Sequence, residues 1–331
     1  MKHSTFTRRL RESKLMLPPL AGYTDLPYRA ILAMFNPPFI VTEMLSAQAV
    51  IRRGPKTMRI LERTVGTSIK GVQLVGSDPA VVGEAARVVE SVGFDYVDIN
   101  MGCTVGKIAQ NGAGISLMKD EDRAVSIASA VVDAVEISVT CKIRIGATRQ
   151  SQNAVQLSRK LADVGVAAIT VHGRSGEKKF GLPVDHQGIK EVVDALTIPV
   201  VANGGIFTGR DAEEMLHRTG AAAVMPGRGL IGNPWLITEI LSTFSGSPYS
   251  PPTLLEKKDI CLLHLRKLCD FYGEKSGTLE MRKILPEYFS GCHHLKDLKH
   301  DVEKVTTSEE VIELLDRIHE GGSKIFYGHL D

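Results

Sequence analysis

The sequence predicts an α/β fold, a (β/α)8 TIM barrel, followed by a small all-α domain. Eight short apolar runs alternate with amphipathic helical patterns between residues 15 and 245. Continuously apolar runs are typical of parallel strands that helices cover on both faces, and eight strand–helix units in this length are typical of a TIM barrel. After residue 252 the pattern is purely helical. An open doubly wound sheet is the alternative, but it rarely extends to eight regular units.

The individual elements follow from the apolar runs, the capping residues and the glycines. Asp25 or Thr24, Asp78 and Thr208 can cap helices, and Gly220 can end one. The expected strands comprise residues 15–20, 39–44, 69–75, 96–102, 138–145, 168–172, 199–202 and 222–226. The expected helices comprise residues 26–35, 46–53, 79–93, 121–135, 153–164, 185–196, 208–220 and 233–244, then 254–272, 278–289 and 308–319, with a short turn near residues 294–300. We therefore predict a basic N-terminal segment (1–14), a barrel (15–245), a Ser- and Pro-rich linker (246–252) and a helical domain (253–331).

Composition indicates an ordinary soluble protein, with 331 residues of which 43% are hydrophobic and 24% charged. The five cysteines are scattered and form no Cys-x-x-Cys pair, so we expect reduced thiols in the cytoplasm rather than disulfides or a zinc site. The stretch Cys292-His293-His294 is a weak metal candidate, because adjacent residues rarely converge on one ion, and we expect no metal. No run reaches the roughly 18 apolar residues of a membrane span. We expect a monomer.

Charge is distributed unevenly although the net charge is only +2. Residues 1–245 hold 28 Lys and Arg against 23 Asp and Glu, whereas residues 246–331 hold 12 against 15. No global basic field indicates a nucleic-acid partner, but a local basic patch is compatible with these counts.

The strand ends carry the strongest functional signal. The C-terminal ends of barrel strands meet at one mouth, and seven of the eight expected strands end in a polar or ionisable side chain. Buried polar groups are unfavourable unless they are paired, so a barrel built only for stability would not need them. These residues are Glu43, Gln73, Asn100 with Cys103, Lys142, His172, Asn203 and Arg228. Taken alone, Cys103 could be a small buried apolar residue, Lys142 a surface lysine and His172 a hydrogen-bonded core histidine.

Two glycine-rich turns after the last two strands predict a phosphate site. They read NGG (residues 203–205) and GRG (227–229), and barrels commonly bind phosphate at this pair of loops. Glycine lets backbone N–H groups approach phosphate oxygens, and Arg228 adds charge. The stretch from Gly227 to Gly232 also matches G-x-G-x-x-G, but it ends the series and lacks the acidic residue expected about 20 positions later, so we reject a dinucleotide site. An FMN enzyme and a phosphosugar isomerase both fit these residues.

The chain resembles the FMN-dependent tRNA-dihydrouridine synthase family. The resemblance rests on motifs that fall in order across residues 15–245, with one more in the helical part. They are PLAGYTD (19–25), QLVGS (73–77), DINMGC (98–103), KIR (142–144), HGR (172–174), NGG (203–205), GRG (227–229), GNPW (232–235) and MRK (281–283). Two positions differ from the family pattern: Thr104 replaces the proline that usually follows the cysteine, and Ile284 replaces a common histidine.

The resemblance implies reduction of the C5–C6 double bond of specific uridines in tRNA, with NADPH reducing FMN and hydride passing from FMN to C6. Cys103 is then the catalytic residue that donates a proton to C5; a thiol ordinarily has a pKa near 8.5 and is protonated at neutral pH. The implied cofactor-binding residues are Pro19, Leu20, Ala21, Gln73, Lys142, His172, Asn203, Gly204, Gly205, Gly227 and Arg228. The implied substrate-binding residues are Asn100, Arg144, Arg282 and Lys283.

The resemblance also implies that residues 253–331 bind RNA, because a flavin reductase of small molecules needs no extra helical domain. The candidates for phosphate contacts there are Lys257, Lys258, Arg266, Lys267, Arg282 and Lys283. The target base must leave its stack to reach a barrel mouth. Two alternatives stay open: the same flavin barrel acting on ribosomal RNA or a free pyrimidine, and a non-reducing RNA-binding flavoprotein.

Overall fold

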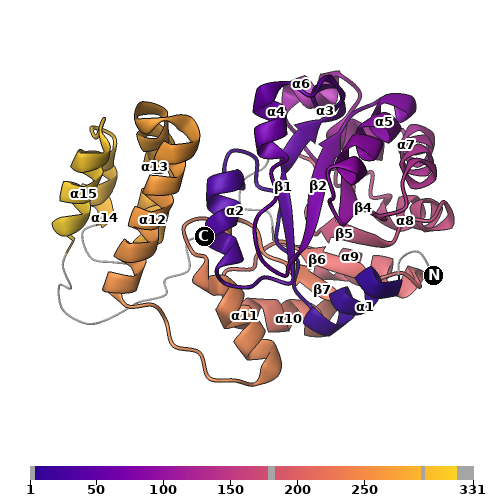
Figure 1. Ribbon diagram of the computed structural model, residues 1–331. Coiled ribbons are helices and arrows are strands. Elements are labelled where there is room, and N and C mark those ends of the chain that lie inside the picture. Colours follow the sequence, from indigo (N-terminus) through magenta and orange to yellow (C-terminus); the bar gives the residue numbers. More distant parts are fainter. Residues whose placement is uncertain (1–3, 178–182, 292–294, 319–331) are drawn as a thin grey trace.

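The computed structural model describes residues 4–177, 183–291 and 295–318. Cys292-His293-His294 and the end of the last expected helix at residue 319 lie outside the described residues. The centre of the fold is a seven-stranded parallel sheet whose strands follow one another in chain order (Figure 1). The strands are β1 (Phe39–Ser46), β2 (Ile69–Val75), β3 (Tyr96–Asn100), β4 (Ser138–Arg144), β5 (Ala168–His172), β6 (Val200–Asn203) and β7 (Ala223–Met225).

The segment at residues 14–17 joins the two edges of this sheet. Leu15 pairs in parallel with Val224 of β7, and the Met16 N–H donates to the Val224 carbonyl at 3.0 Å. On the other side, the Leu17 N–H donates to the Phe39 carbonyl of β1 at 3.2 Å. The curled parallel sheet is thus consistent with a TIM-barrel-like domain. The first strand, expected at residues 15–20, is reduced to one bridge because the prolines at 18 and 19 lack the N–H that would extend the ladder.

Helices surround the sheet, and their starts follow the predicted caps. Asp25 accepts from the Tyr28 N–H at 2.9 Å, Asp78 caps the helix that begins at residue 79, and Thr208 forms a capping box with Asp211. The surrounding helices are α2 (Leu26–Ala33), α3 (Ala47–Arg52), α4 (Pro55–Ile60), α5 (Pro79–Ser91), α6 (Gly106–Gln110), α7 (Glu121–Ala134), α8 (Ala154–Asp163), α9 (His186–Ala195), α10 (Gly209–Thr219) and α11 (Trp235–Ser245), with short 3-10 turns η1 (Gly114–Met118) and η2 (Arg228–Leu230).

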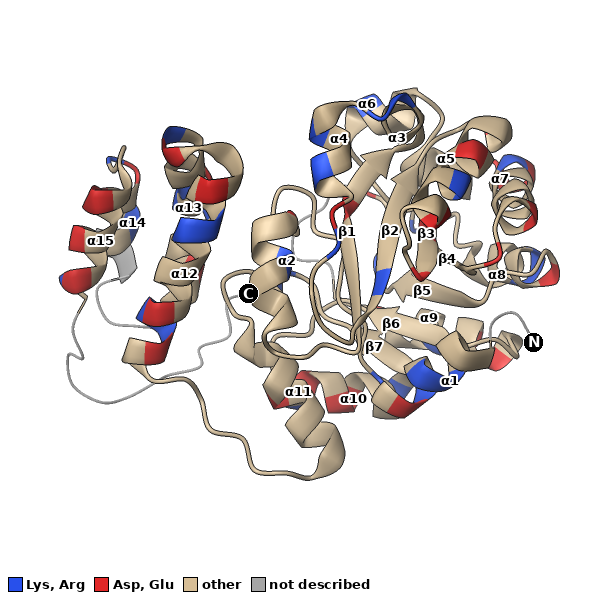
Figure 2. Ribbon diagram, in the orientation of Figure 1, with Lys and Arg blue, Asp and Glu red and all other residues tan. Residues whose placement is uncertain are grey.

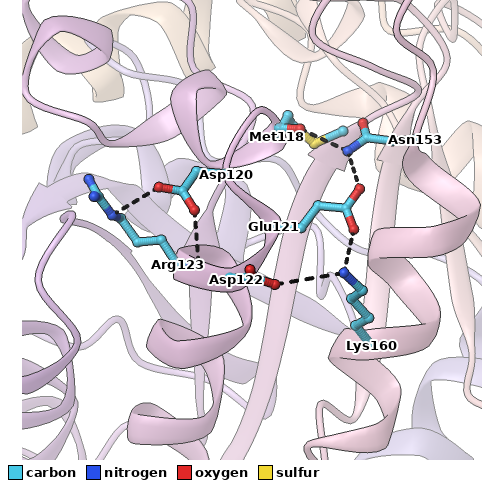
Figure 3. A network of polar contacts seen from close by, with 7 residues as sticks. All are labelled: Met118, Asp120, Glu121, Asp122, Arg123, Asn153 and Lys160. Atoms are coloured by element: carbon cyan, nitrogen blue, oxygen red, sulfur yellow. Dashed lines mark hydrogen bonds and ion pairs between the residues drawn. The ribbon is translucent and has the colours of Figure 1, made fainter.

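Figure 3 shows how two neighbouring helices, α7 and α8, are tied together by polar groups. The Asn153 amide, just before α8, donates to the Met118 carbonyl at 2.8 Å and to Glu121 of α7 at 2.7 Å. The other Glu121 oxygen pairs with the Lys160 ammonium at 2.8 Å. Since Lys160 is partly exposed, its ion pair with Glu121 contributes little to stability, and this network mainly aligns the helices.

The N-terminal segment, which the sequence suggests is simply basic, forms the helix α1 (Ser4–Ser13). Its two apolar residues, Phe6 and Leu10, are buried. The Phe6 ring packs against Phe39 at 5.1 Å and Tyr96 at 5.3 Å between centroids, and these are the first residues of β1 and β3. Helix α1 therefore covers the N-terminal ends of the strands with an apolar cluster.

In the described residues after α11 there are four further helices: α12 (Leu254–Tyr272), α13 (Glu274–Tyr288), α14 (Leu295–Val302) and α15 (Ser308–Asp316). Helices α12 and α13 pack on one side of the sheet's helical layer, next to α2 (Figure 1). His264 of α12 stacks on Tyr28 of α2 with 5.0 Å between ring centroids. One apolar cluster includes residues of both parts, so α12 and α13 share a continuous core with the sheet and its helices.

No helix in the described part of the chain is both long enough and apolar enough to cross a membrane. The same residues contain no group of three or more His, Cys, Asp and Glu side chains that could hold a metal ion.

Candidate active site

The polar side chains at the strand ends meet at the C-terminal end of the sheet. In the strand register Asn100 lies beside Lys142, and His172 lies between Arg144 and Asn203. The Lys142 ammonium donates to the Asn203 side-chain oxygen at 3.0 Å, and the Asn203 amide donates to a β7 carbonyl at 2.8 Å. Residues from β3 to β7 thus form one polar surface at this end.

Cys103 lies in the loop directly after β3, and its thiol is free and partly buried. Its N–H donates to the Asn100 side-chain oxygen at 2.9 Å, and its carbonyl accepts from the Ile115 N–H at 2.9 Å. Gly114 stands in the left-handed region with φ of 59°, and a Cβ there would lie 2.7 Å from the Cys103 carbonyl oxygen. The backbone of Cys103 is therefore held from both sides, although Thr104 follows it instead of proline.

A chain of side-chain hydrogen bonds runs inward from this loop. The Asn100 amide nitrogen donates to the Gln73 side-chain oxygen at 2.9 Å, and the Gln73 amide nitrogen donates to Asp98 at 2.6 Å. The Thr140 hydroxyl donates to the other Asp98 oxygen, also at 2.6 Å. Three of these four side chains are no more than 3% exposed and Asn100 is 8% exposed. Asp98 and Thr140 were not among the site residues expected from the sequence.

Cationic side chains gather around His172. Burial, together with the positive charges of Lys142, Arg144, Arg174 and Arg228, lowers the pKa of His172 to about 2. Burial also lowers the pKa of Lys142 to about 8, with Arg144 adding to the effect. His172 is therefore neutral at physiological pH, while Lys142 stays largely protonated. Such a concentration of positive charge around a neutral imidazole is suited to binding an anion.

The turn after β6 lies against this cationic group. Gly204 has φ of 129° and Gly205 has φ of 68°, conformations that side chains rarely adopt. A Cβ on Gly204 would lie 3.1 Å from the His172 ring. Gly227 has open space around it, and Arg228, which follows it, is exposed. The two turns expected to bind phosphate thus lie at the cationic end of the sheet.

Arg144, expected to bind substrate, contacts backbone carbonyls of two loops. Its Nε donates to the Gly102 carbonyl at 2.8 Å, next to Cys103, and its Nη1 donates to the Ser175 carbonyl at 2.9 Å. Burial lowers the pKa of Arg144 from its usual value. Arg144 therefore links the loop after β3 to the loop after β5.

The segment with Pro19, Leu20 and Ala21 lies just beyond the sheet-closing residues. Pro19 and Leu20 are partly buried and Ala21 is exposed. The Leu20 N–H donates to the Thr24 hydroxyl at 2.9 Å, and the next N–H after Ala21, that of Gly22, donates to Glu43 of β1 at 3.0 Å. These contacts hold the loop against the same end of the sheet.

Arg282 and Lys283 lie on α13. The Arg282 Nε donates to the Val305 carbonyl at 2.6 Å, which connects α13 to the segment before α15. Lys283 pairs with Glu280 and lines a small crevice with Tyr23. Ile284, at the position that differs from the family pattern, is buried in the core.

A basic stretch that sequence reasoning missed lies at residues 52–63. It holds Arg52, Arg53, Lys56, Arg59 and Arg63 against the single acid at residue 62. All five are exposed, and Arg59 also stacks on the Phe271 ring of α12 at 4.0 Å. Figure 2 shows basic residues on α4 and on the nearby α6, which follows the Cys103 loop. A charge count over a short window would have found this stretch.

The chain matches the family model described as "Dihydrouridine synthase (Dus)" over residues 16–321. Similar curated proteins include a "Probable tRNA-dihydrouridine synthase" of Rickettsia conorii, 37% identical over 284 residues that cover 84% of this chain and 85% of the relative. Two proteins named "tRNA-dihydrouridine synthase B" are also similar. That of Proteus vulgaris is 33% identical over 92% of this chain and 95% of its own, and that of Xanthomonas campestris is 34% identical over 91% of each.

Both the family model and these relatives extend over most of the chain, including the strands, the cationic strand ends and the helices that follow. Identity above 30% over more than four fifths of each chain is far beyond a shared fold alone. The chain belongs to the dihydrouridine synthase family of enzymes.

Proposed function

We propose that this protein reduces specific uridines of tRNA to 5,6-dihydrouridine, with FMN as its cofactor and NADPH as the reductant. The observation that carries the proposal is the joint placement of a fixed cysteine, a partly buried lysine and a cationic phosphate turn at one end of the sheet. The names of the relatives support tRNA as the substrate. In this reading the barrel is residues 15–245 and the helical unit is residues 253–331.

The residues at the strand ends fit FMN. The group of cations around His172 can neutralise a phosphate, and Gly204, Gly205, Gly227 and Arg228 offer N–H groups and charge beside it. Lys142 and Asn203 form a linked pair between the phosphate turn and β4, where the flavin ring would lie with His172. Pro19, Leu20, Ala21 and Gln73 are the remaining residues proposed to hold the ring. FMN supplies the hydride when it is bound.

Cys103 is proposed to donate the proton to C5 of the uracil ring. A proton donor must be held in a fixed place relative to the base, and both backbone groups of Cys103 are hydrogen-bonded. Asn100, which holds the Cys103 N–H, lies at the same strand end and is proposed to face the base. The base must be turned out of the RNA stack to reach them.

The RNA backbone is proposed to contact two surfaces. One is the basic stretch at residues 52–63, because it follows β1 and so lies at the same end of the sheet as the Cys103 loop. Its Arg59 also contacts α12, so a polynucleotide could pass from this stretch to the helical unit. The other surface comprises Lys257, Lys258, Arg266, Lys267, Arg282 and Lys283 on α12 and α13. Arg144 is proposed to act near the substrate by holding the loop that carries Cys103.

Dihydrouridine mapping tests this proposal. RNA from cells that lack the gene, and every other gene of the family, is compared with RNA from the same cells carrying the wild-type gene. We expect specific tRNA dihydrouridines to return with the wild-type gene and not with Cys103→Ala. Return of dihydrouridine only in ribosomal RNA would replace tRNA as the substrate, and no return at any site would exclude RNA reduction. Purified protein should also release FMN on denaturation; colourless protein that cannot be reconstituted with FMN would refute the cofactor.

A further inference from the structure

We propose that Asp98 is a positioning residue that sets the direction of the Gln73 and Asn100 amides and, through them, the place of Cys103. The proposal concerns the geometry of the Cys103 loop, and its catalytic consequence rests on the proposed function. Asp98 touches neither the loop nor the proposed base site directly; it acts through two amides.

The Asp98 carboxylate fixes which end of the Gln73 side-chain amide donates a hydrogen bond and which end accepts one. Asp98 is 3% exposed and accepts two hydrogen bonds of 2.6 Å, one on each oxygen. An ionised carboxylate can only accept. The Gln73 side chain must therefore turn its nitrogen toward Asp98, which leaves its oxygen facing Asn100.

The same logic extends to the cysteine. Because the Gln73 oxygen faces Asn100, the Asn100 nitrogen must point to it, at 2.9 Å. The Asn100 oxygen is then free to accept from the backbone N–H groups of Gly102 at 3.2 Å and Cys103 at 2.9 Å. Reversing either amide would place N–H groups against N–H groups in a buried site, which is strongly unfavourable. The Asp98 carboxylate at one end and the backbone N–H groups of Gly102 and Cys103 at the other thus favour the same orientation of both amides.

The charge of the Asp98 carboxyl changes with pH not far below neutrality. Burial raises the pKa of Asp98 to about 6, while the hydrogen bonds from Thr140 and Gln73 and the charge of Lys142 act in the opposite direction. At neutral pH the carboxylate is mostly ionised, and below about pH 6 it gains a proton. A protonated carboxyl has one donor and one acceptor, so it no longer enforces a single direction. The groups that interact with Asp98 are Gln73 on β2, Thr140, Cys141 and Lys142 on β4, and Tyr96 on its own strand.

Asp98→Asn is a sharp test because an amide, like a protonated carboxyl, has one donor and one acceptor end. We expect its kcat at pH 7.5 to fall by about tenfold to a hundredfold, the effect of a slightly misplaced reacting group. The wild-type kcat should fall below about pH 6 toward the rate of the variant, whose own rate should lack this acid limb. Asp95→Asn is the matched control, since Asp95 lies three residues earlier and caps the Lys70 N–H at the other end of β3.

A second readout does not depend on the reaction. The rate at which iodoacetamide alkylates Cys103, followed by peptide mass spectrometry, reports the geometry of the loop, and the partly buried Cys269 on α12 serves as an internal reference. We expect Asp98→Asn to change the Cys103 rate by at least about threefold and to leave the Cys269 rate unchanged. Unchanged alkylation together with a wild-type pH profile would overturn the role of Asp98. Absence of uridine reduction by the wild-type enzyme would refute the proposed function instead, and alkylation alone would then decide the role of Asp98.

Discussion

The two ends of the same parallel sheet are built from opposite chemistry. At the N-terminal end, Phe6 of α1 packs on Phe39 and Tyr96, and the cluster is apolar. At the C-terminal end, the same strands finish in amides and cations such as Asn100 and Lys142. In barrel enzymes the C-terminal end is the one that carries chemistry, whereas the other end contributes stability. The contrast separates what holds this molecule together from what it does.

The polar end is unfavourable for folding, as the direction of its pKa shifts shows. Burial lowers the pKa of Lys142 to about 8 and that of His172 to about 2, and it raises that of Asp98 to about 6. In each case the environment disfavours the charged form. A protein tolerates such groups where a ligand or a reaction needs them.

The largest effect is expected from Cys103→Ala at the polar end. Loss of a proton donor lowers kcat by about 10²- to 10⁴-fold, while FMN content and thermal stability should stay near wild type, because the thiol is only partly buried. Steady-state turnover on unmodified tRNA, together with a thermal melt, measures both. Cys269→Ala, a partly buried cysteine on α12, is the control. Unchanged turnover in Cys103→Ala would mean that another group donates the proton.

Phe6→Ala is the corresponding change at the apolar end. Truncating a buried aromatic residue lowers the free energy of unfolding by about 3–5 kcal/mol, and Phe6 contacts two further buried rings. The turnover of the folded fraction should be unchanged, because no charged or catalytic group is touched. Urea unfolding at 25 °C and kcat per bound FMN separate the two quantities. A loss of kcat without a loss of stability would break the division between the two ends.

Lys142→Met tests whether the polar end is kept at the expense of stability. The pKa of Lys142 falls from 10.5 to about 8 on folding, so cofactor-free protein is destabilised by its charge by up to about 3 kcal/mol at pH 7. This penalty is present below about pH 8 and disappears as pH rises toward 10.5, since the lysine is then neutral in both states. The variant without FMN should therefore unfold at higher urea than wild type at pH 7, with the difference shrinking above pH 8.

The same substitution should weaken FMN binding. A cation at Lys142 favours an anionic ligand, so the wild-type Kd for FMN should rise as pH passes about 8, by at most about tenfold per pH unit. Lys142→Met should bind more weakly and lose this dependence. Quenching of flavin fluorescence between pH 7 and 9.5 measures it. If the Kd of Lys142→Met for FMN rose with pH in the same way as that of the wild type, a group other than Lys142 would cause the pH dependence.

Sequence reasoning located the polar end but not the contacts within it. Apolar runs and caps such as Asp78 and Thr208 were enough to predict seven strands and most of their helices. The expected first strand was too long because the pattern of apolar residues outweighed the missing N–H groups of two prolines. Asp98 lay inside a quoted motif, yet its partners come from two other strands, and no linear spacing reveals which amide faces a carboxylate. Helix α1 was missed because two apolar residues among several cations give a weak signal.

The smallest effect is expected from the exposed arginines, for which the chain offers a matched pair at the two ends. Arg52 and Arg53 lie at the end of α3 near the Cys103 loop, whereas Arg8 and Arg9 lie on α1; all four are exposed. If the RNA backbone contacts residues 52–63, Arg52→Gln/Arg53→Gln should weaken tRNA binding by about 10- to 30-fold. It should also reduce the slope of log K against log salt by about two, one per lost phosphate contact.

Arg8→Gln/Arg9→Gln removes the same charge from the other end of the sheet. It should leave the tRNA affinity and the salt slope nearly unchanged, because α1 covers the N-terminal ends of the strands, away from the Cys103 loop. Filter binding of unmodified tRNA from 50 to 200 mM salt measures both variants. Equal losses in the two variants would mean that net charge, and not the basic stretch beside the polar end, attracts the RNA. A larger loss in the α1 variant would place the RNA on the wrong end of the barrel for catalysis at Cys103.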